Sequence, residues 1–296
     1  MTDGHRRKKR HVRDSQPEPM VLTERDKQII EAVYSYRCLR QDQIHSLFFS
    51  GSTSTSQRRL MLLYHHAYLN RVFLTSRASV QFSPVAYVLD KLGAEILRSE
   101  FGYSIDNLHS LPGQAGQQFL AHTLAVNDVR VSITLACRHQ GCSILTWKGE
   151  SELKADYDRV QISGKNGRRV SVSLIPDSFF ILSTPLGRAH FFLELDRGQM
   201  GLDRFRGKIE AYRAYVQHGA YTRRYGAKTV RVLSVTLSEA RLRNLQRTTE
   251  TAGGRERFWF GILSELTPEN ILSGQVWSIA GHDEKFPLIQ QEDETL

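Results

Sequence analysis

The sequence predicts an α/β (α+β) protein with two domains: a small helical domain that ends in a hairpin, and a larger domain around a mixed sheet. Three observations lead to this prediction. The chain has 296 residues, enough for two domains, and 40% of them are hydrophobic, which supports a buried core. Apolar residues repeat at helical spacing in some segments and gather in β-branched runs in others. A Gly-, Ser- and Pro-containing stretch, residues 102–118, separates the two parts and is predicted to be a linker.

The charge of the chain favours a polyanionic partner. The formal net charge is +9, and nucleic acid is the commonest partner of such a cationic chain. The charge is concentrated in HRRKKRHVR at residues 5–13, and Pro17 and Pro19 follow. We therefore expect residues 1–21 to form a disordered basic arm that adds unspecific phosphate contacts. A solvated tail without a role is the alternative.

Other features point to a cytoplasmic protein. No apolar run approaches the roughly 20 residues of a membrane span, and no apolar segment of a secretory signal follows the basic N-terminus. The three cysteines, Cys38, Cys137 and Cys142, are an odd number without a CxxC pair. We expect them to be reduced thiols.

The first domain is predicted over residues 22–101. Thr23 is a good N-cap for the first helix, with Asp26 as the acid of a capping box. Apolar periodicity then predicts helices over 22–38, 41–49 and 54–66, two short strands over 69–75 and 85–89, and a fourth helix over 91–100. Three helices followed by a hairpin are the order of a winged helix-turn-helix domain.

In such a domain the third helix reads the DNA. Polar side chains near its start can reach base edges, Gln to adenine and Arg to guanine, and basic residues of the hairpin can contact phosphates. The candidate DNA-binding residues are Ser56, Gln57, Arg58, Arg59, Arg71 and Arg77. A winged helix used only for protein contact is the alternative.

The second domain is predicted over residues 119–281, with a loose acidic tail over 282–296. Its predicted elements are a long helix (119–138), a strand (143–147), an irregular polar segment (149–168), a hairpin (about 178–195), a helix (203–217), a strand (229–236), a helix (238–248), and strands over 258–263 and 275–279. This α/β order predicts a mixed sheet.

The hairpin of the second domain gathers carboxylates. Asp177 opens its first strand, Pro185 and Gly187 turn the chain, and the second strand ends with Glu194 and Asp196. Side chains alternate along a strand, so Glu194 and Asp196 share a face. Oxygen ligands that converge in this way suit Mg²⁺ or Mn²⁺, metals that clamp a phosphodiester during hydrolysis. Surface pairing of the acids with nearby arginines is the alternative.

This arrangement resembles the PD-(D/E)xK nuclease core. The resemblance implies that Asp177 and Glu194 bind metal, but Asp196 stands where such nucleases have a lysine that orients the attacking water. Lys208 on the next helix is the expected substitute for that lysine. Alternatively, Asp196 is a third metal ligand, or the site is degenerate and has lost activity. The candidate catalytic residues are Asp177, Glu194, Asp196 and Lys208.

The chain as a whole resembles the replication-relaxation family of plasmids and other mobile elements. The resemblance covers about residues 22–277 and rests on LTERDKQII, SQRRLMLLYHHAYLNR, HTLAVNDV, IPDSFF, FFLELDRG, KIEAYRAY and RVLSVT. It implies a DNA-binding protein of plasmid replication or mobilisation, with double-stranded DNA as partner and a metal-dependent nicking or cleaving domain. A second copy of the chain and other replication or mobilisation proteins are further candidate partners. A non-enzymatic regulator that keeps the nuclease-like domain as a scaffold is the alternative function.

Overall fold

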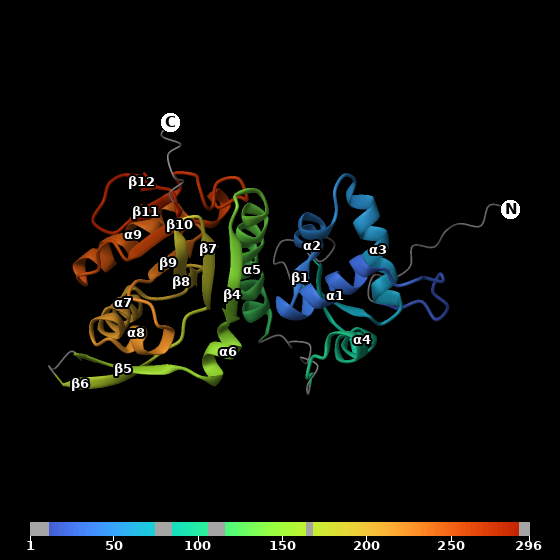
Figure 1. Cartoon of the computed structure of the whole chain (residues 1–296), viewed down its shortest axis with the longest axis horizontal. Helices are drawn as coiled ribbons and strands as arrows, with labels where there is room; N and C mark the ends of the chain where they lie inside the picture. Colours follow the sequence, from blue (N-terminus) through green and yellow to red (C-terminus); the bar gives the residue numbers. More distant parts are fainter. Residues whose placement is uncertain (1–11, 75–84, 106–115, 164–167, 290–296) are drawn as a thin grey trace. The chain divides into compact units, whose positions relative to one another are not determined.

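The computed structural model describes residues 12–74, 85–105, 116–163 and 168–289 and divides the chain into two compact units, Met1–Asn127 and Asp128–Leu296 (Figure 1). The boundary falls inside a long helix, α5 (Gly116–His139), rather than in the linker predicted over 102–118. The first half of this helix packs on the first unit, which the sequence pattern alone did not reveal.

The first unit has the predicted order of three helices, a hairpin and a fourth helix. Its elements are α1 (Glu24–Ser35), β1 (Leu39–Arg40), α2 (Gln41–Phe48), α3 (Thr53–His65), β2 (Leu69–Phe73), β3 (Val85–Leu89) and α4 (Lys91–Phe101). The strands form an antiparallel sheet in the order β1-β3-β2. The added strand β1 has only two residues, which is too short for a periodic signal. This is the element order of a winged helix-turn-helix domain.

Local sequence explains how α1 begins. The Thr23 side chain accepts a bond from the Asp26 amide, and the Asp26 carboxylate accepts a 2.7 Å bond from the Thr23 amide, so the predicted capping box is present. Further along the chain, Asn127 of α5 donates bonds to the carbonyls of Tyr36 (3.1 Å) and Cys38 (2.7 Å). The buried amide of Asn127 thereby satisfies two carbonyls that follow α1.

The predicted arm at residues 1–21 ends earlier than expected, because residues from Arg13 onward pack on α3 and β2. Arg13 donates to the carbonyls of Tyr64 (2.8 Å) and Leu69 (3.2 Å) and forms an ion pair with Asp90. The Glu18 carbonyl lies 2.8 Å from Nε2 of His66. Arg13, one of the six Lys and Arg residues of the predicted arm, therefore forms contacts within the first unit instead of extending from it. Residues 1–11 lie outside the described residues.

The second unit is built on a mixed sheet with the order β12-β11-β10-β9-β8-β7-β4. After α5 come β4 (Ser143–Gly149), α6 (Glu150–Ala155), β5 (Asp158–Ser163), β6 (Arg169–Leu174), β7 (Ser178–Thr184), β8 (Gly187–Asp196), α7 (Leu202–Gln217), α8 (Ala220–Tyr225), β9 (Arg231–Thr236), α9 (Glu239–Thr251), β10 (Phe258–Ile262), η2 (Leu263–Glu265), β11 (Trp277–Ile279) and β12 (Lys285–Phe286). Strands β8, β9 and β10 are parallel, and the other pairs are antiparallel. The predicted mixed sheet is confirmed.

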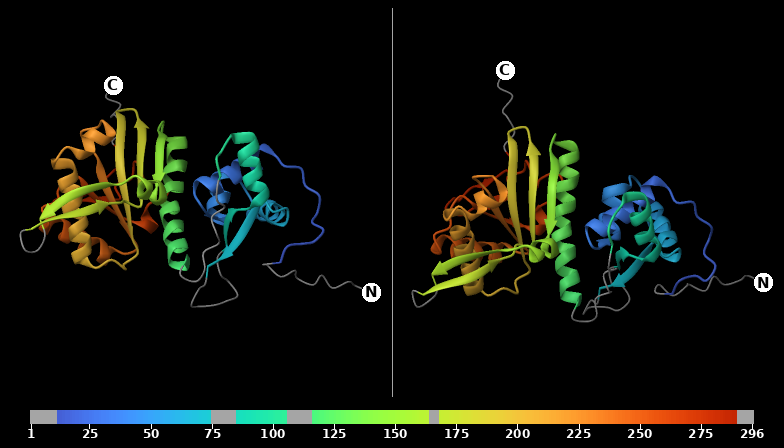
Figure 2. Two further views of the ribbon diagram at one scale, coloured as in Figure 1. Left: turned by 90° about the horizontal axis from the view of Figure 1, so that it is seen from below. Right: turned by 60° about the horizontal axis from the view of Figure 1, so that its bottom comes forward.

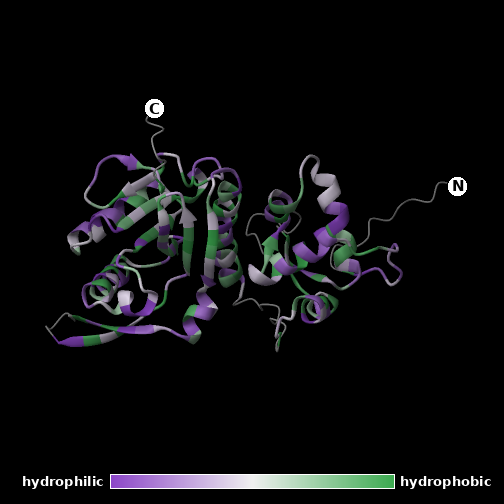
Figure 3. Cartoon of the chain, viewed as in Figure 1, coloured by the Kyte–Doolittle hydropathy of each residue, from purple (hydrophilic) through white to green (hydrophobic). Residues whose placement is uncertain are grey.

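Side-chain alternation on the β7–β8 hairpin assigns the two faces of this sheet. Phe179 pairs with Phe192, and both belong to the core formed with α7 and α9, whereas Phe180 pairs with Phe191 on the opposite face. The second half of α5, residues 128–139, lies on the side of the sheet away from α7 and α9 (Figure 2). Figure 3 shows hydrophobic residues along the strands of this sheet and polar residues on the outer helix surfaces.

Two segments of the second unit differ from the sequence prediction. The polar segment 149–168 contains α6 and β5, and β5 pairs with β6 as a separate antiparallel ribbon. Val160 and Leu174 are buried against the core of the unit, while the opposite side of the ribbon is polar, which explains why the segment was predicted to be irregular. The tail expected to be loose from residue 282 includes β12 and buried Leu288. No helix in the described parts of the chain is long and apolar enough to span a membrane.

Candidate functional site

The register of the β7–β8 hairpin brings Asp177 beside Glu194. Ser178 pairs with Leu193, so the residue before β7 lies opposite the following residue of β8. The Asp177 amide donates to the Leu193 carbonyl at 3.0 Å, and the Asp177 carboxylate accepts a 2.7 Å bond from the Leu195 amide. Hydrogen bonds to the backbone of Leu193 and Leu195, on either side of Glu194, thereby hold Asp177 beside Glu194, as the hairpin prediction required.

Two side chains of α7 bind the Glu194 carboxylate. Lys208 donates to Oε2, and the Tyr212 hydroxyl donates to Oε1 at 2.6 Å. Lys208 and Tyr212 are four residues apart and so share a helix face. Only 7% of the Glu194 side chain is exposed, whereas 25% of Lys208 is exposed, so the lysine is the solvent-facing member of the pair. Lys208 thus lies beside Glu194, and its role as the substitute for the missing lysine stays a prediction.

The charges of this cluster are coupled. Burial opposes the charge on Lys208, but the carboxylates of Glu194 and Asp177 outweigh burial and raise the pKa of Lys208. Burial, followed by the neighbouring Glu194, raises the pKa of Tyr212. Lys208 is therefore an ammonium group and Tyr212 a neutral donor at neutral pH. Burial also raises the pKa of Glu194, against the attraction of Lys208.

Asp196 does not join the other two acids. Its carboxylate accepts a 2.6 Å bond from Nε of Arg241 on α9 and a 2.8 Å bond from the Gly198 amide. Arg241 also donates to the Met200 carbonyl, so one arginine holds the loop after β8. Glu194 and Asp196 lie on the same face as predicted, but Asp196 has an arginine partner of its own.

The three predicted ligands consequently do not form one cluster. Among the residues that the structure describes, no group of three or more His, Cys, Asp or Glu side chains is placed to hold a metal ion. Asp177 and Glu194 alone still provide a donor set that fits Mg²⁺, since this ion commonly takes one or two carboxylates and completes its shell with water and substrate phosphate. Metal binding by this pair stays a prediction.

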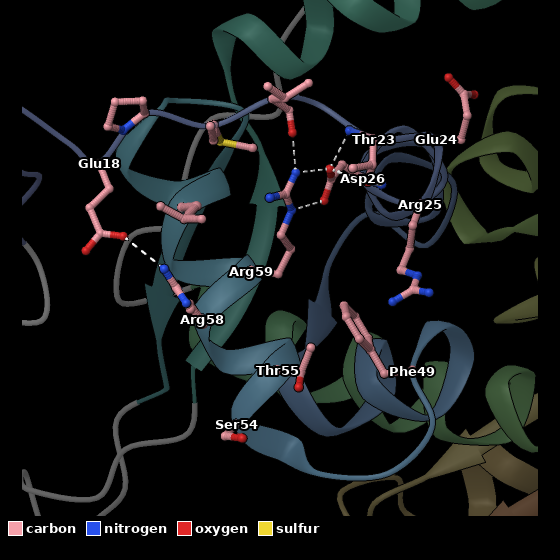
Figure 4. A pocket seen from close by; sticks show the side chains of 14 residues that line it. Glu18, Thr23, Glu24, Arg25, Asp26, Phe49, Ser54, Thr55, Arg58 and Arg59 are labelled. Atoms are coloured by element: carbon pink, nitrogen blue, oxygen red, sulfur yellow. Dashed lines mark hydrogen bonds and ion pairs between the residues drawn. The ribbon is translucent and has the colours of Figure 1, made fainter.

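The start of α3 differs from the predicted DNA-reading surface. Ser56 is buried, and its hydroxyl donates to the Thr53 carbonyl at 2.8 Å and lies 3.1 Å from Nδ1 of His45. Arg59 forms an ion pair with the fully buried carboxylate of Asp26 and donates to the Val21 carbonyl at 2.6 Å (Figure 4). Both residues therefore serve the internal packing of this unit, and their assignment as base-reading residues is corrected.

Other candidates on this unit face solvent. Gln57 is exposed, and 73% of the Arg58 side chain is exposed, with only a 3.4 Å ion pair to exposed Glu18. Arg71 is half-buried, and its guanidinium lies 4.2 Å from the centre of the Tyr64 ring. Arg77 lies outside the described residues. Gln57 and Arg58 are thus the predicted base-contacting residues that the structure leaves accessible.

A groove runs along the same part of α3. Ser54, Thr55 and Arg58 line it from α3, while Arg25 and Phe49 line the opposite wall, and residues 18–21 close one side (Figure 4). The guanidinium of Arg25 lies 5.2 Å from the centre of the Phe49 ring. Arg25 thus adds a cation from α1 to this surface, outside the helix that was predicted to read the DNA.

Comparison with known proteins identifies the family. Residues 30–230, more than half of the chain, match the family described as replication-relaxation. The chain belongs to the replication-relaxation family. A comparison of the chain with curated proteins found no match. A solved structure titled "Structure of restriction endonuclease FokI" is similar at 9% identity and a TM-score of 0.29, over 82% of this chain and 42% of the other. The present chain thus spans less than half of the length of that protein.

Two site residues of this replication-relaxation protein were not predicted from its sequence. The place of Tyr212 in the site could have been predicted, because it follows Lys208 by about one helical turn and so lies on the same helix face. The sequence gives less indication of Arg241, which lies in the first turn of α9 after the cap Ser238. Only the tertiary packing of α9 brings Arg241 to Asp196.

Proposed function

We propose that this protein binds double-stranded DNA through its first unit and acts in the cytoplasm in the replication or mobilisation of a plasmid or other mobile element. The exposed side chains of Gln57 and Arg58 on α3, beside the groove that Arg25 also lines, are the observation that carries this proposal. Helix N-terminal residues that enter the major groove can donate to guanine through Arg and bond adenine through Gln. Membership of the replication-relaxation family supports the same role.

The two accessible residues of α3 provide a sharp test of DNA binding. A duplex selected from a random library is titrated with the wild-type protein, Arg58→Ala and Gln57→Ala at fixed salt. We expect each variant to lose about 1–3 kcal/mol of binding free energy if its side chain contacts a base. Arg247→Ala, which removes a charge from α9 in the second unit, is the matched control. Unchanged affinity in both α3 variants would reject the assignment of α3 as the DNA-reading helix.

We further propose a metal-dependent phosphodiester reaction at Asp177, Glu194 and Lys208. A bound Mg²⁺ or Mn²⁺ would supply Lewis-acid stabilisation of the phosphate. Asp177 and Glu194 would hold the ion from adjacent strands, while Lys208 would keep an ammonium group beside them. That group is suited to orienting a water molecule or stabilising negative charge on the phosphate. Lys208 would thus perform from α7 the role that a strand lysine has in the PD-(D/E)xK pattern.

A second candidate function is favoured by one specific observation. Glu194 is buried and both of its oxygens accept bonds from α7, while Asp196 is paired with Arg241. Such internal pairing also suits a regulator that keeps this domain as a scaffold without turnover. The two functions differ in their dependence on metal.

A plasmid-nicking assay discriminates between the two functions. Supercoiled DNA is incubated with the wild-type protein, with and without Mn²⁺ or Mg²⁺, and with Asp177→Asn and Lys208→Ala. The nuclease function predicts nicking that needs metal and is lost in Asp177→Asn, while the duplex affinity of that variant stays unchanged. Full duplex binding without metal-dependent nicking in the wild type would favour the regulator.

A further inference from the structure

The second unit has a pocket at the N-terminal end of β8, whereas Glu194 and Asp196 lie at the C-terminal end of this strand. Its volume is about 470 Å³, and it is bounded by the β7–β8 turn, the start of β9 and the segment before β10. Four cationic or titratable side chains line it, Arg188, His190, Arg231 and Arg257, together with one acid, Glu256. Arg188 and Glu194 are six positions apart along β8, which is roughly 20 Å at 3.3 Å per residue, so the two sites are distinct.

Two of the arginines are held rigidly. The Arg231 guanidinium lies 4.7 Å from the centre of the Trp259 ring and 5.8 Å from that of Phe191, and Nη1 donates to the Leu288 carbonyl. Arg257 donates to the Val230 carbonyl at 3.0 Å. Two aromatic rings and a backbone bond therefore fix the Arg231 guanidinium, and a backbone bond orients that of Arg257, while each retains further N–H donors.

The positive charge of this pocket is not neutralised within the described residues. Among the described residues, no ion pair joins Arg188, Arg231 or Arg257 to a carboxylate, and Glu256 is exposed to solvent. Burial lowers the pKa of both Arg231 and Arg257, and burial together with Arg188 lowers the pKa of His190. Half-buried cations without a counter-ion are costly, so an anion that enters the pocket gains strong attraction.

We infer that this pocket binds a phosphate group. A guanidinium fork with fixed orientation matches the paired oxygens of a phosphate, and the volume of the pocket falls within the range of small-ligand sites, which is about 300–1,000 Å³. The phosphate belongs either to a free nucleotide or to a DNA strand. This inference does not depend on catalysis by Asp177 and Glu194 or on DNA binding by α3.

Titration of the full-length protein with sodium pyrophosphate tests the inference. Calorimetry and thermal shift are measured against sodium chloride of equal ionic strength for the wild type, Arg257→Gln and Arg231→Lys. We expect the wild type to bind and each variant to lose at least about tenfold in affinity, because Arg231→Lys keeps the charge but loses the fork. Arg188→Ala, at an exposed position that tolerates change, should also weaken binding. Arg247→Ala should bind like the wild type.

Two further ligands identify the source of the phosphate. Thymidine 5′-monophosphate is compared with a short single strand that carries or lacks a 5′-phosphate. Equal affinity for the mononucleotide and the phosphorylated strand identifies a nucleotide site, whereas a strand preference that needs the 5′-phosphate identifies a DNA-end site. Absence of pyrophosphate binding to the wild type would overturn the inference, as would equal binding by the wild type, Arg188→Ala and Arg257→Gln.

Discussion

Lys208 on α7 donates a hydrogen bond to Glu194 at the end of β8, so a helix supplies the cation that the strand lacks at position 196. Asp196 occupies that strand position and is paired with Arg241 instead. The charge balance of the site therefore depends on how α7 and α9 pack on the sheet, not on the strand alone.

Replacing Lys208 should destabilise the second unit and change its alkaline behaviour. Lys208→Met leaves Glu194 buried without its cation, and we expect a loss of about 1–3 kcal/mol in unfolding free energy at pH 7. The pKa of Lys208 is raised in the folded state, so its contribution is present below its ordinary pKa of 10.5 and is lost as pH rises through the folded value. Urea unfolding between about pH 7 and 11 should show this loss in the wild type but a smaller one in Lys208→Met. Arg243→Met on α9 is the control.

The Asp26–Arg59 pair should make the first unit sensitive to acid. Burial raises the pKa of Asp26, but bonds from Arg59 and Thr23 outweigh it and lower this pKa below its ordinary 3.8. The stabilisation is therefore present above 3.8 and is lost as pH falls through the folded pKa. Arg59→Ala should cost about 2–4 kcal/mol at pH 7, because it leaves a buried carboxylate without its partner. Thermal unfolding at neutral and acidic pH measures both effects, and an equal stability of Arg58→Ala and Arg59→Ala would contradict them.

The basic N-terminal residues should contribute salt-dependent affinity for DNA. Deleting residues 2–11 removes five Lys and Arg residues, and the slope of log K against log salt should fall by about 0.9 for each phosphate that these residues contact in the wild type. Sequence preference should not change. Arg13→Ala is the informative contrast, since Arg13 bonds Tyr64, Leu69 and Asp90 and its removal should lower stability more than it lowers the slope. An unaltered slope after the deletion would exclude the arm from the DNA interface.

Divalent metal should stabilise the protein only while Asp177 and Glu194 are intact. Millimolar Mg²⁺ or Mn²⁺ should raise the Tm of the wild type in proportion to occupancy, and Asp177→Asn combined with Glu194→Gln should abolish the shift. Asp196→Asn is a matched control that the structure supplies, because its carboxylate is bonded to Arg241 and should not be a ligand. Its own Tm should fall while the shift caused by metal remains. If Asp196→Asn also lost the rise in Tm caused by metal, Asp196 would be a ligand and the predicted three-acid site would be correct.

The sequence predicted those parts of the fold that depend on local pattern. Two apolar runs separated by Pro185 and Gly187 predicted the β7–β8 hairpin, and the register of this hairpin brings Asp177 to Glu194. The ribbon β5–β6 was missed although Val160, Val172 and Leu174 alternate as strand residues do, since most of the residues between them are polar. Buried Ser56 could have been recognised, because it lies four residues before the core residue Leu60 on the same helix face.

Long-range pairing explains the remaining differences. Asp26 was correctly predicted as a capping acid, but its ion pair with Arg59 joins residues 33 positions apart. Arg241 reaches Asp196 across 45 positions. Apolar periodicity shows which face of a helix is buried but not which polar groups of another element it will meet. Polar partners of this kind follow only from the tertiary packing.

The separation of the acids from their cation along the chain also has a consequence for the order of folding. Strands β7 and β8 are joined by a two-residue turn, whereas β9 pairs with β8 only after α7 and α8 have crossed over. Closing a short hairpin loses less chain entropy than closing the long crossover, so we expect Asp177 and Glu194 to meet early. Lys208 can reach them only once α7 docks. Repulsion between two uncompensated acids would then oppose the early hairpin, and a divalent cation present during refolding should speed this step.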